Sequence, residues 1–273
     1  MHYREFHPSA PLAPFVERFW WLEGPAGSVA ADPIPPDGRV EIILHAGDPF
    51  VERAATGALT PQARVLVAGQ ATRAVDVRPE GHARVLGARL RPHAARLLTG
   101  VPAHELTDRI CDLGSVAPAL ASALACDVLD RPGPAAMVAA FDAVLQPVAA
   151  RAGGRPPSPA VDLALRSRGL CRVDDLAVRV GSSPRQLERA FRDHVGLSPK
   201  QFLRIVRFQE VLGALSEDRP DVTWATLAAE HGFYDQAHLI GDFRAFLGMP
   251  PGAWNVKRSS LAAVFSALGR DAT

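Results

Sequence analysis

The sequence predicts an α+β protein. We expect a β-rich amino-terminal domain, barrel-like or sandwich-like with trailing helices, followed by an all-α domain of two helix-turn-helix motifs joined by a long helix. Three observations predict this: short apolar runs separated by Gly and Pro in the first hundred residues, a Gly- and Pro-rich stretch at 151–159, and an internal repeat after it. The expected organisation is a first domain at 1–150, a linker at 151–159, a helical domain at 160–257 and a tail at 258–273.

The composition is that of a soluble globular protein. The chain has 273 residues, of which 48% are hydrophobic and 22% charged, enough for two domains. Three scattered cysteines (Cys111, Cys126 and Cys171) suit neither a disulfide framework nor a metal site, and they fit a reducing compartment. No stretch approaches 18 uninterrupted apolar residues and no signal-peptide pattern follows Met1. We therefore expect a cytoplasmic protein without a membrane partner.

The first domain is predicted from short runs of β-branched, aromatic and other apolar residues. These runs lie at 15–22, 39–44, 64–69, 74–78 and 83–90. The turn signal Pro35-Pro36-Asp37-Gly38 precedes the second run. Helices are expected over 93–98, 115–129 and 134–150. Of Trp20 and Trp21, we expect one in the core and the other over a sheet edge; the alternative is that they line a ligand pocket.

The second domain contains an internal repeat with an offset of 52 residues. Six positions keep this offset: Leu187, Phe191, Arg192, Gly196, Pro199 and Phe202 recur as Leu239, Phe243, Arg244, Gly248, Pro251 and Trp254. Chance rarely preserves one offset over six positions. The sequence therefore predicts two copies of one small helical unit.

Each copy reads as a short helix, a Gly-containing turn and a second helix. In the first copy, 174–180 is followed by Gly181, and Ser183 with Gln186 predicts a capping box for the next helix. In the second copy, 224–230 precedes a turn and a helix capped by Asp235.

A helix from Pro199 to about Ser216 would join the two copies. Its length of roughly 27 Å could hold two recognition helices near the ~34 Å of one DNA turn. Net charge supports a nucleic-acid partner only weakly, since it is +1 overall, −2 for residues 1–153 (14 basic, 16 acidic) and +3 for residues 154–273 (16 basic, 13 acidic).

The motif residues resemble the AraC/XylS family of bacterial transcription regulators. The resemblance covers about 160–257 and is carried by Gly196-Leu197-Ser198-Pro199-Lys200-Gln201-Phe202 followed by Arg207, and by 232–246 in the second copy. The first half resembles, more loosely, a domain found ahead of this module in some actinobacterial-type members, through Pro36-Asp37-Gly38, 87–92 and 106–108.

The resemblance implies that the chain binds double-stranded DNA sequence-specifically. It maps base-edge contacts to Arg185, Glu188, Arg189, Gln236, Ala237 and His238. Phosphate contacts are expected from Ser183, Arg192, Lys200, Arg204, Arg207 and Asp235. Two departures weaken the second motif: Gly241 stands where members commonly carry a long polar residue, and Pro250 replaces the usual Ser or Thr before Pro251.

No catalytic, metal-binding or cofactor site is expected. The sequence contains no GxSxG elbow, no Gly-rich phosphate loop and no HExxH pair. We therefore expect a regulator, not an enzyme, whose first domain senses a small-molecule effector or forms a homodimer, with RNA polymerase as a further candidate partner. The alternative is a DNA-anchored interaction protein whose first domain binds a protein partner.

Overall fold

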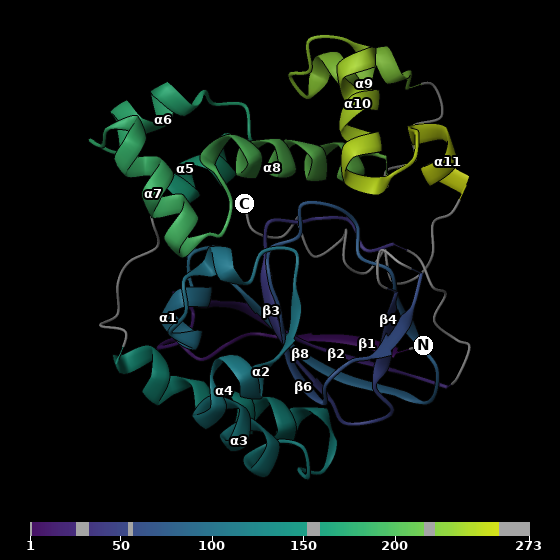
Figure 1. Cartoon of the computed structure of the whole chain (residues 1–273), viewed down its shortest axis with the longest axis vertical. Helices are drawn as coiled ribbons and strands as arrows, with labels where there is room; N and C mark the ends of the chain where they lie inside the picture. The colour runs from purple at the N-terminus through teal and green to yellow at the C-terminus, as the bar shows by residue number, and fades with distance from the viewer. Residues whose placement is uncertain (1, 26–32, 54–56, 152–158, 216–221, 257–273) are drawn as a thin grey trace.

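The computed structural model describes residues 2–25, 33–53, 57–151, 159–215 and 222–256. The first domain has three layers, a group of helices, a six-stranded sheet and a smaller three-stranded sheet, and the second domain is entirely helical (Figure 1). The expected α+β class is confirmed. Most of the expected linker at 151–159 and the tail at 258–273 lie outside the described residues.

The two sheets of the first domain are antiparallel. The larger sheet has the order β1-β2-β8-β3-β6-β9, formed by β1 (His2–Phe6), β2 (Val16–Gly24), β8 (Ala83–Leu90), β3 (Val40–His45), β6 (Val65–Ala68) and β9 (Ile110–Asp112). The smaller has the order β5-β4-β7, formed by β5 (Leu59–Pro61), β4 (Phe50–Arg53) and β7 (Val77–Pro79). The sequence predicted a barrel-like or sandwich-like domain, and the structure is sandwich-like. Strands β1, β4, β5 and β9 were not predicted.

The larger sheet buries both faces, and neighbouring residues of β2 show how. Phe19 and Trp21 pack in the main core beneath the helices, while Trp20 and Leu22 face the smaller sheet. This is the two-residue alternation of a strand buried on both sides. Trp20 pairs across strands with Gly87, where an added Cβ would lie 2.1 Å from the indole. Both tryptophans are therefore buried, and only Trp20 faces the space between the sheets.

Helices cover the outer face of the larger sheet. They are α1 (Ala95–Thr99), the short 3-10 helix η1 (Ala103–Glu105), α2 (Leu113–Val116), α3 (Pro118–Asp127) and α4 (Gly133–Arg151). The single helix expected over 115–129 is wrong: the backbone at Ala117 is extended (φ −139°, ψ 72°), because the residue before a proline avoids the helical region, and α3 starts at Pro118.

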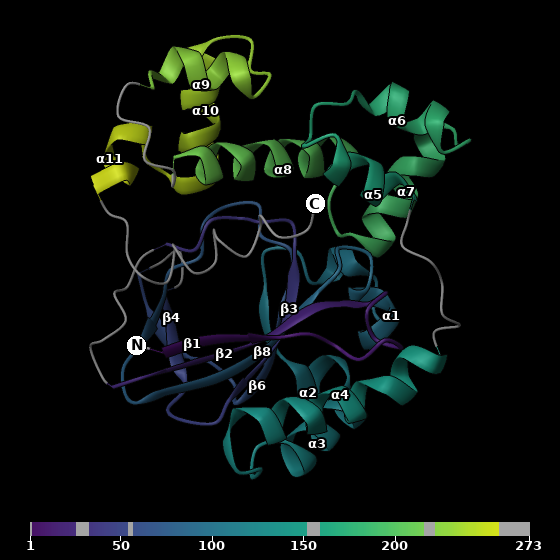
Figure 2. The ribbon, with the colours of Figure 1, turned by 180° about the vertical axis from the view of Figure 1, so that it is seen from behind.

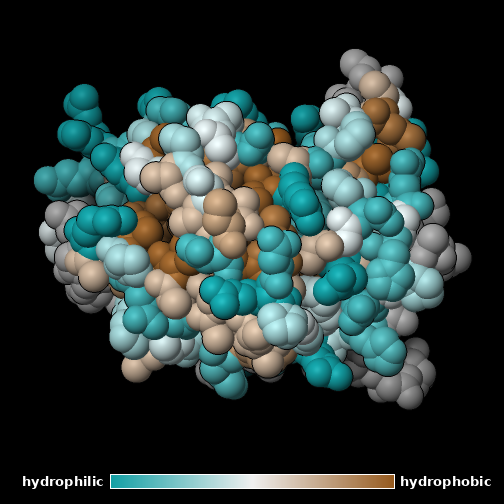
Figure 3. Space-filling view, turned by 90° about the horizontal axis from the view of Figure 1, so that it is seen from below, coloured by the Kyte–Doolittle hydropathy of each residue, from teal (hydrophilic) through white to brown (hydrophobic). Residues whose placement is uncertain are grey.

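Helix α4 is long and apolar. It meets the length and hydropathy of a membrane span, with a mean hydropathy of 1.3, although a core helix of a soluble protein can do the same. Its Met137, Phe141 and Leu145 side chains are buried in the main core. On the face seen in Figure 3, apolar residues lie among polar ones.

The second domain consists of seven helices within the described residues. They are α5 (Pro159–Arg166), α6 (Val173–Arg179), α7 (Pro184–His194), α8 (Pro199–Ala214), α9 (Trp224–Glu230), α10 (Gln236–Leu247) and α11 (Pro251–Val256). Helix α8 has 16 residues, about 24 Å. It carries α6 and α7 near one end and α9 and α10 near the other (Figures 1 and 2).

The predicted repeat is confirmed by matching local structure. Helices α7 and α10 start at Pro184 and Gln236, 52 residues apart, and each is preceded by a short helix. Gly196 and Gly248, also 52 residues apart, have φ of 89° and 69°. The apolar residues of the repeat, including Phe202 and Trp254, are buried in one core. Helix α11, which corresponds to the start of α8, was not predicted.

The contact between Trp20 and Gly87 generates a stability prediction. Gly87→Ala should destabilise the chain by about 1–3 kcal/mol, because the methyl group would overlap the buried indole. Urea unfolding measures this, with Gly241→Ala as the control, since a Cβ at Gly241 meets nothing within 4 Å. An unchanged unfolding midpoint for Gly87→Ala would contradict the packing described.

Candidate nucleic-acid interface and cavity

The second helix of each helix-turn-helix unit has a capped amino terminus. At α7, Ser183 Oγ accepts a hydrogen bond from the Gln186 amide (3.2 Å) and the Ser183 amide donates to Gln186 Oε1 (3.0 Å). At α10, the Asp235 carboxylate accepts a hydrogen bond from the His238 amide (2.7 Å). The predicted capping box and the predicted Asp235 cap are therefore confirmed. Both capping side chains that were expected at phosphates are used to start helices.

The residues expected to read bases are exposed on these two helices. On α7 the exposed set is Arg185, Glu188 and Arg189, one turn or less apart, while Leu187 and Phe191 face the core. On α10 the exposed set is Gln236, Ala237 and His238. The His238 ring also accepts a hydrogen bond from the Tyr234 amide through Nδ1 (3.4 Å), so it supports the helix start.

Both recognition helices hold their amino-terminal turns away from the first domain. The carboxyl ends of both helices contact the first domain instead. Near the end of α7, the Asp193 carboxylate lies 3.4 Å from the Arg96 guanidinium of α1. Near the end of α10, the Phe246 carbonyl accepts a hydrogen bond from the Ala74 amide (2.6 Å). The two ribbon views show the same orientation (Figures 1 and 2). The ends that enter a major groove in helix-turn-helix proteins therefore point outward.

The four cationic residues expected at phosphates fall into two groups. Arg192 and Lys200 are exposed. Arg204 forms an ion pair with the buried Asp242 of α10 (2.6 Å), and Arg207 lies 3.9 Å from the same carboxylate and 4.4 Å from the Phe233 ring centre. Burial lowers the pKa of Arg207. Arg204 and Arg207 thus join α8 to the second unit.

Within the described residues, three hydrogen bonds join the two domains. The Thr107 hydroxyl donates to the Gly196 carbonyl (2.7 Å), at the loop between α7 and α8. The Gln209 amide of α8 donates to the Pro36 carbonyl (2.7 Å), and the third bond joins Ala74 to Phe246. The first domain therefore contacts both helix-turn-helix units and the helix between them.

The Pro36–Gly38 turn fits closely against α8. Gly38 has a φ of 75°, and a Cβ there would lie 3.1 Å from the Phe202 ring. The Gly38 carbonyl accepts a hydrogen bond from the buried Gln70 amide (2.9 Å). Asp37 Oδ1 accepts a hydrogen bond from the Arg39 amide (2.9 Å). The turn is therefore fixed from both sides.

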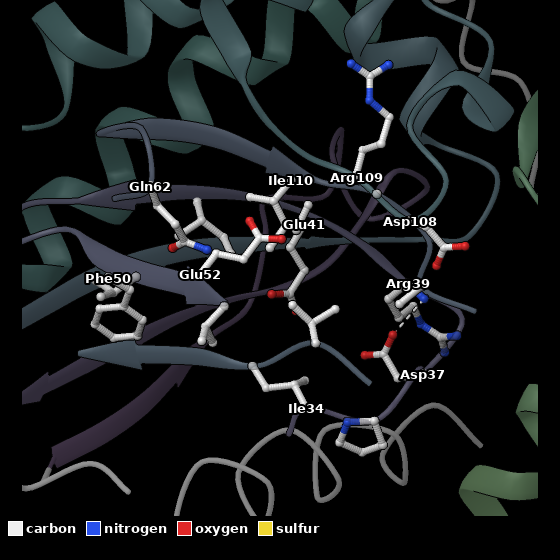
Figure 4. A pocket seen from close by; sticks show the side chains of 18 of the residues that line it. Ile34, Asp37, Arg39, Glu41, Phe50, Glu52, Gln62, Asp108, Arg109 and Ile110 are labelled. Atoms are coloured by element: carbon white, nitrogen blue, oxygen red, sulfur yellow. Dashed lines mark hydrogen bonds between the residues drawn. The ribbon is translucent and has the colours of Figure 1, made fainter. Parts of the chain in front are cut away.

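A cavity lies between the two sheets of the first domain (Figure 4). Its volume is about 120 Å³. Apolar walls come from both sheets, with Trp20, Leu22, Ile43 and Val85 on one side and Phe50 and Val77 on the other. Polar groups also line it, namely Asp37, Arg39, Glu41, His45, Glu52, Gln62, Asp108 and Arg109. Apolar walls with a few converging polar groups are typical of small-molecule sites.

A buried ion cluster forms one end of this cavity. The Arg89 guanidinium has no exposed surface and contacts Asp37, Glu41 (3.1 Å) and Glu17 (3.8 Å). Arg39 contacts the same Glu17 (2.6 Å). The pKa of Arg89 is raised: burial lowers it, but the three carboxylates outweigh burial.

The carboxylate on the cavity side of this cluster has an unusual affinity for protons. Burial raises the pKa of Glu41 to about 7, and the charges of Asp37 and Glu17 act in the same direction against Arg89. Burial also raises the pKa of Glu52, which lies on β4. Figure 4 shows both side chains reaching into the space between the sheets.

Each of the three interdomain hydrogen bonds involves a residue of the first domain that directly precedes a residue lining the cavity. Pro36 precedes Asp37, Ala74 precedes Val75, and Thr107 precedes Asp108. Asp108 also accepts hydrogen bonds from the Thr72 amide (2.7 Å) and hydroxyl (2.6 Å). The same loops thus line the cavity and form the docking surface, by which we mean the residues Pro36, Ala74 and Thr107 that bond to the second domain.

Trp20 lines the cavity, which agrees with the alternative stated for the two tryptophans, but the sequence did not predict the other walls of the cavity or its ion cluster. One signal was present, because Glu41 and Arg89 interrupt apolar strands at positions that face inward. The sequence Pro36-Asp37-Gly38 indicates a turn but not that Asp37 pairs with Arg89 beside a cavity. No cluster of three or more metal-ligating side chains occurs within the described residues.

Similar proteins were found for both parts of the chain. The HTH-type transcriptional regulator GbdR of Pseudomonas aeruginosa is 34% identical over 82 residues, which is 29% of this chain and 21% of the relative, so the match spans about a fifth of the relative's length. ToxT from Vibrio cholerae is a structural neighbour with 8% identity and a TM-score of 0.47, covering 86% of this chain and 98% of that chain. Wild-type ToxT bound to an unsaturated fatty acid has 8% identity and a TM-score of 0.44, covering 86% and 94%.

Family models cover both domains. Residues 4–112 match the model described as Domain of unknown function (DUF6597), and residues 176–257 match the model described as Helix-turn-helix domain. The second match contains both recognition helices and all of α8. The chain therefore carries an AraC-type helix-turn-helix domain at its carboxyl end, as its motifs indicated, behind an amino-terminal DUF6597 domain.

Proposed function

We propose that the chain is a sequence-specific DNA-binding transcription regulator whose first domain controls DNA binding in response to a small molecule. The observation that carries the proposal is the adjacency of the cavity and the interdomain contacts at Asp37, Val75 and Asp108. A ligand shifts DNA affinity only if it interacts differently with the competent and incompetent arrangements. A molecule in this cavity contacts the loops that bind the second domain, so it can change the free-energy difference between the two arrangements.

Direct base contacts are proposed for the outward faces of α7 and α10. Arg185 and Arg189 lie one turn apart on α7, and arginine can bind guanine O6 and N7 through two hydrogen bonds. Glu188 can accept a hydrogen bond from cytosine, and Gln236 of α10 suits adenine. Ala237 and His238 complete the second surface, with Gly241 beside them offering no side chain.

Phosphate contacts are proposed for the exposed Arg192 and Lys200 and for the amino-terminal turns that begin after Ser183 and Asp235. Arg204 and Arg207 are weaker candidates, because a phosphate would have to compete with the buried Asp242 carboxylate for them. The cavity also favours the sensing role over the alternative, a first domain that binds a protein partner.

The first prediction concerns DNA recognition by α7. Selection from a promoter library should yield fragments that the full chain retards in a gel, with affinity falling steeply as salt rises. On such a site, Arg189→Ala should weaken binding by about 1–3 kcal/mol and relax the preference at one base pair. Arg151→Ala removes an exposed arginine from the first domain and serves as the control. Equal affinities for these two variants would refute the assignment.

The second prediction concerns α10. Gly241→Ala should leave operator affinity nearly unchanged and stabilise the chain by roughly 0.5–1 kcal/mol, because glycine disfavours a helix interior and its Cβ position is open. Binding assays and urea unfolding on the same samples measure both effects. A loss of specific binding would show that the backbone at Gly241 must approach the DNA closely.

The third prediction concerns the contact between domains. Gly38→Ala strains a left-handed turn and pushes a methyl group toward Phe202, so it should loosen the first domain from α8 and weaken operator binding about fivefold or more. Gly100→Ala is the matched control, because its φ of 82° gives the same strain with nothing within 4 Å. Operator affinities that are equal for the two variants would argue against coupling.

A further inference from the structure

We propose that the cavity of the first domain takes a small organic cation, a protonated amine on an apolar body, with Glu41 and Glu52 as its counter-charges. This inference rests on the proposed function for the role of the cavity as an effector site. The choice of a cation follows from the charges of the lining, the size of the cavity and its apolar walls.

The cations of the lining are not directed at a ligand. The Arg39 guanidinium is buried and is held by Glu17 through Nε (2.6 Å). Arg109 donates from Nη1 to the Glu105 carbonyl (3.1 Å), and its side chain points away from the cavity (Figure 4). Among the described lining residues, therefore, neither arginine offers its charge to an anion inside.

The acids of the lining outnumber these cations by four to two. Two of the four acids already have strong donors, since Asp37 is paired with Arg89 and Asp108 accepts two hydrogen bonds from Thr72. Glu41 shares Arg89 with Asp37 and Glu17 and also accepts a hydrogen bond from the Trp20 indole. The Glu52 carboxylate has no hydrogen bond or ion pair within the described residues. Glu41 and Glu52 are thus the under-compensated charges.

The wider ion cluster has the same imbalance. Among the residues that the structure describes, it contains four carboxylates (Glu5, Glu17, Asp37 and Glu41) and three guanidinium groups (Arg18, Arg39 and Arg89), so the described carboxylates outnumber the guanidinium groups by one. Burial is the largest cause of the raised pKa of Glu41 and the cause of the raised pKa of Glu52, and the charges of Asp37 and Glu17 add to it at Glu41. An ammonium group between the two carboxylates would supply the missing positive charge and donate hydrogen bonds to both.

Size and walls define the rest of the ligand. A cavity of about 120 Å³ is somewhat smaller than the ~150 Å³ of an engineered cavity that binds benzene, so it suits one ring or a short branched chain. Trp20 and Phe50 contribute aromatic surface to the walls. Such rings accept apolar bodies and attract cations over their faces. The inferred ligand is therefore a primary amine whose apolar part has about six or seven carbon atoms.

The same carboxylate connects the cavity to the docking surface. Arg89 donates from Nη1 to Glu41 and contacts Asp37 through Nη2. A cation that pairs with Glu41 weakens the hydrogen bond between Glu41 and Arg89. The Arg89 guanidinium then interacts more strongly with Asp37, which lies in the turn that packs on α8. Charge neutralisation in the cavity would thereby reach the second domain.

Calorimetric titration of the full chain, without DNA, tests the ligand class. Benzylamine, benzyl alcohol and benzoate have similar shapes and charges of +1, 0 and −1. We expect benzylamine to bind at least about tenfold more tightly than the alcohol, and benzoate to give no measurable binding. Stronger binding of the alcohol or of benzoate, or no binding of benzylamine, would overturn the proposal.

Variants identify the carboxylates that matter. Glu52→Gln and Glu41→Gln should each weaken benzylamine binding about tenfold without affecting the alcohol. Glu80→Gln, an exposed acid in the turn before β8, should leave both unchanged. Glu52→Gln remains decisive if Glu41→Gln fails to fold, because Glu52 is only half-buried. Unchanged benzylamine binding in Glu52→Gln would overturn the assignment.

The affinity for the amine should rise with pH. A Glu41 pKa of about 7 means that most of this carboxyl is protonated at about pH 6 and ionised at about pH 8, while the amine stays protonated at both. The charged and titratable groups around Glu41 are Arg89, Asp37, Glu17 and Tyr3, and the pKa values of Arg89 and Tyr3 are raised away from neutrality. Binding should therefore strengthen up to about tenfold over this interval. A decrease would contradict the role given to Glu41.

Operator affinity is measured separately, with and without benzylamine. Binding of the amine without any effect on DNA affinity would support the ligand class and refute its role as an effector. If the chain does not bind benzylamine but Arg189→Ala still weakens operator binding, the ligand class is refuted and the proposed DNA contact is supported. The two proposals can thus fail independently.

Discussion

The burial of one guanidinium group determines much of the first domain. Arg89 has no exposed surface, and an ion removed from water costs several kcal/mol unless partners replace its hydration. Carboxylates from β2, β3 and the turn before β3 meet this requirement. Because Asp37 is one of them, the same interaction fixes the turn that contacts α8. The cluster thus lies beside the cavity and fixes one of the three described segments that hydrogen-bond to the second domain.

The helical domain was predictable because its signals are local. The capping residues Ser183 and Asp235, the inward pattern of Leu187 and Phe191, and the offset of 52 residues each depend on neighbours in sequence. The structure confirms each of them. Long-range partners were not predicted: the fold brings Asp242 beside Arg204 and Arg207, and their phosphate contacts stay predictions. The base contacts themselves stay predictions.

The first domain was less predictable because both faces of its larger sheet are buried. The strands then lack the alternation of apolar and polar residues that marks a half-exposed sheet. The sequence therefore does not indicate which of Trp20 and Trp21 faces the helices and which faces the smaller sheet. The three-residue strands β5, β7 and β9 are too short to leave a period. The cavity needs strands β4 and β7 to form its second wall, so it could not be predicted without them. The break at Pro118 was readable in principle, since Ala117 precedes a proline.

The chemistry of the interdomain contacts has a consequence for evolution. Of the six atoms in the three interdomain hydrogen bonds, four belong to the main chain: the carbonyls of Pro36, Gly196 and Phe246 and the amide of Ala74. Main-chain groups persist through most substitutions. Substitutions of the Pro36, Ala74 and Phe246 side chains therefore need not remove these hydrogen-bonding groups, so the sequences of the two domains are free to change at these positions while the hydrogen bonds between them remain.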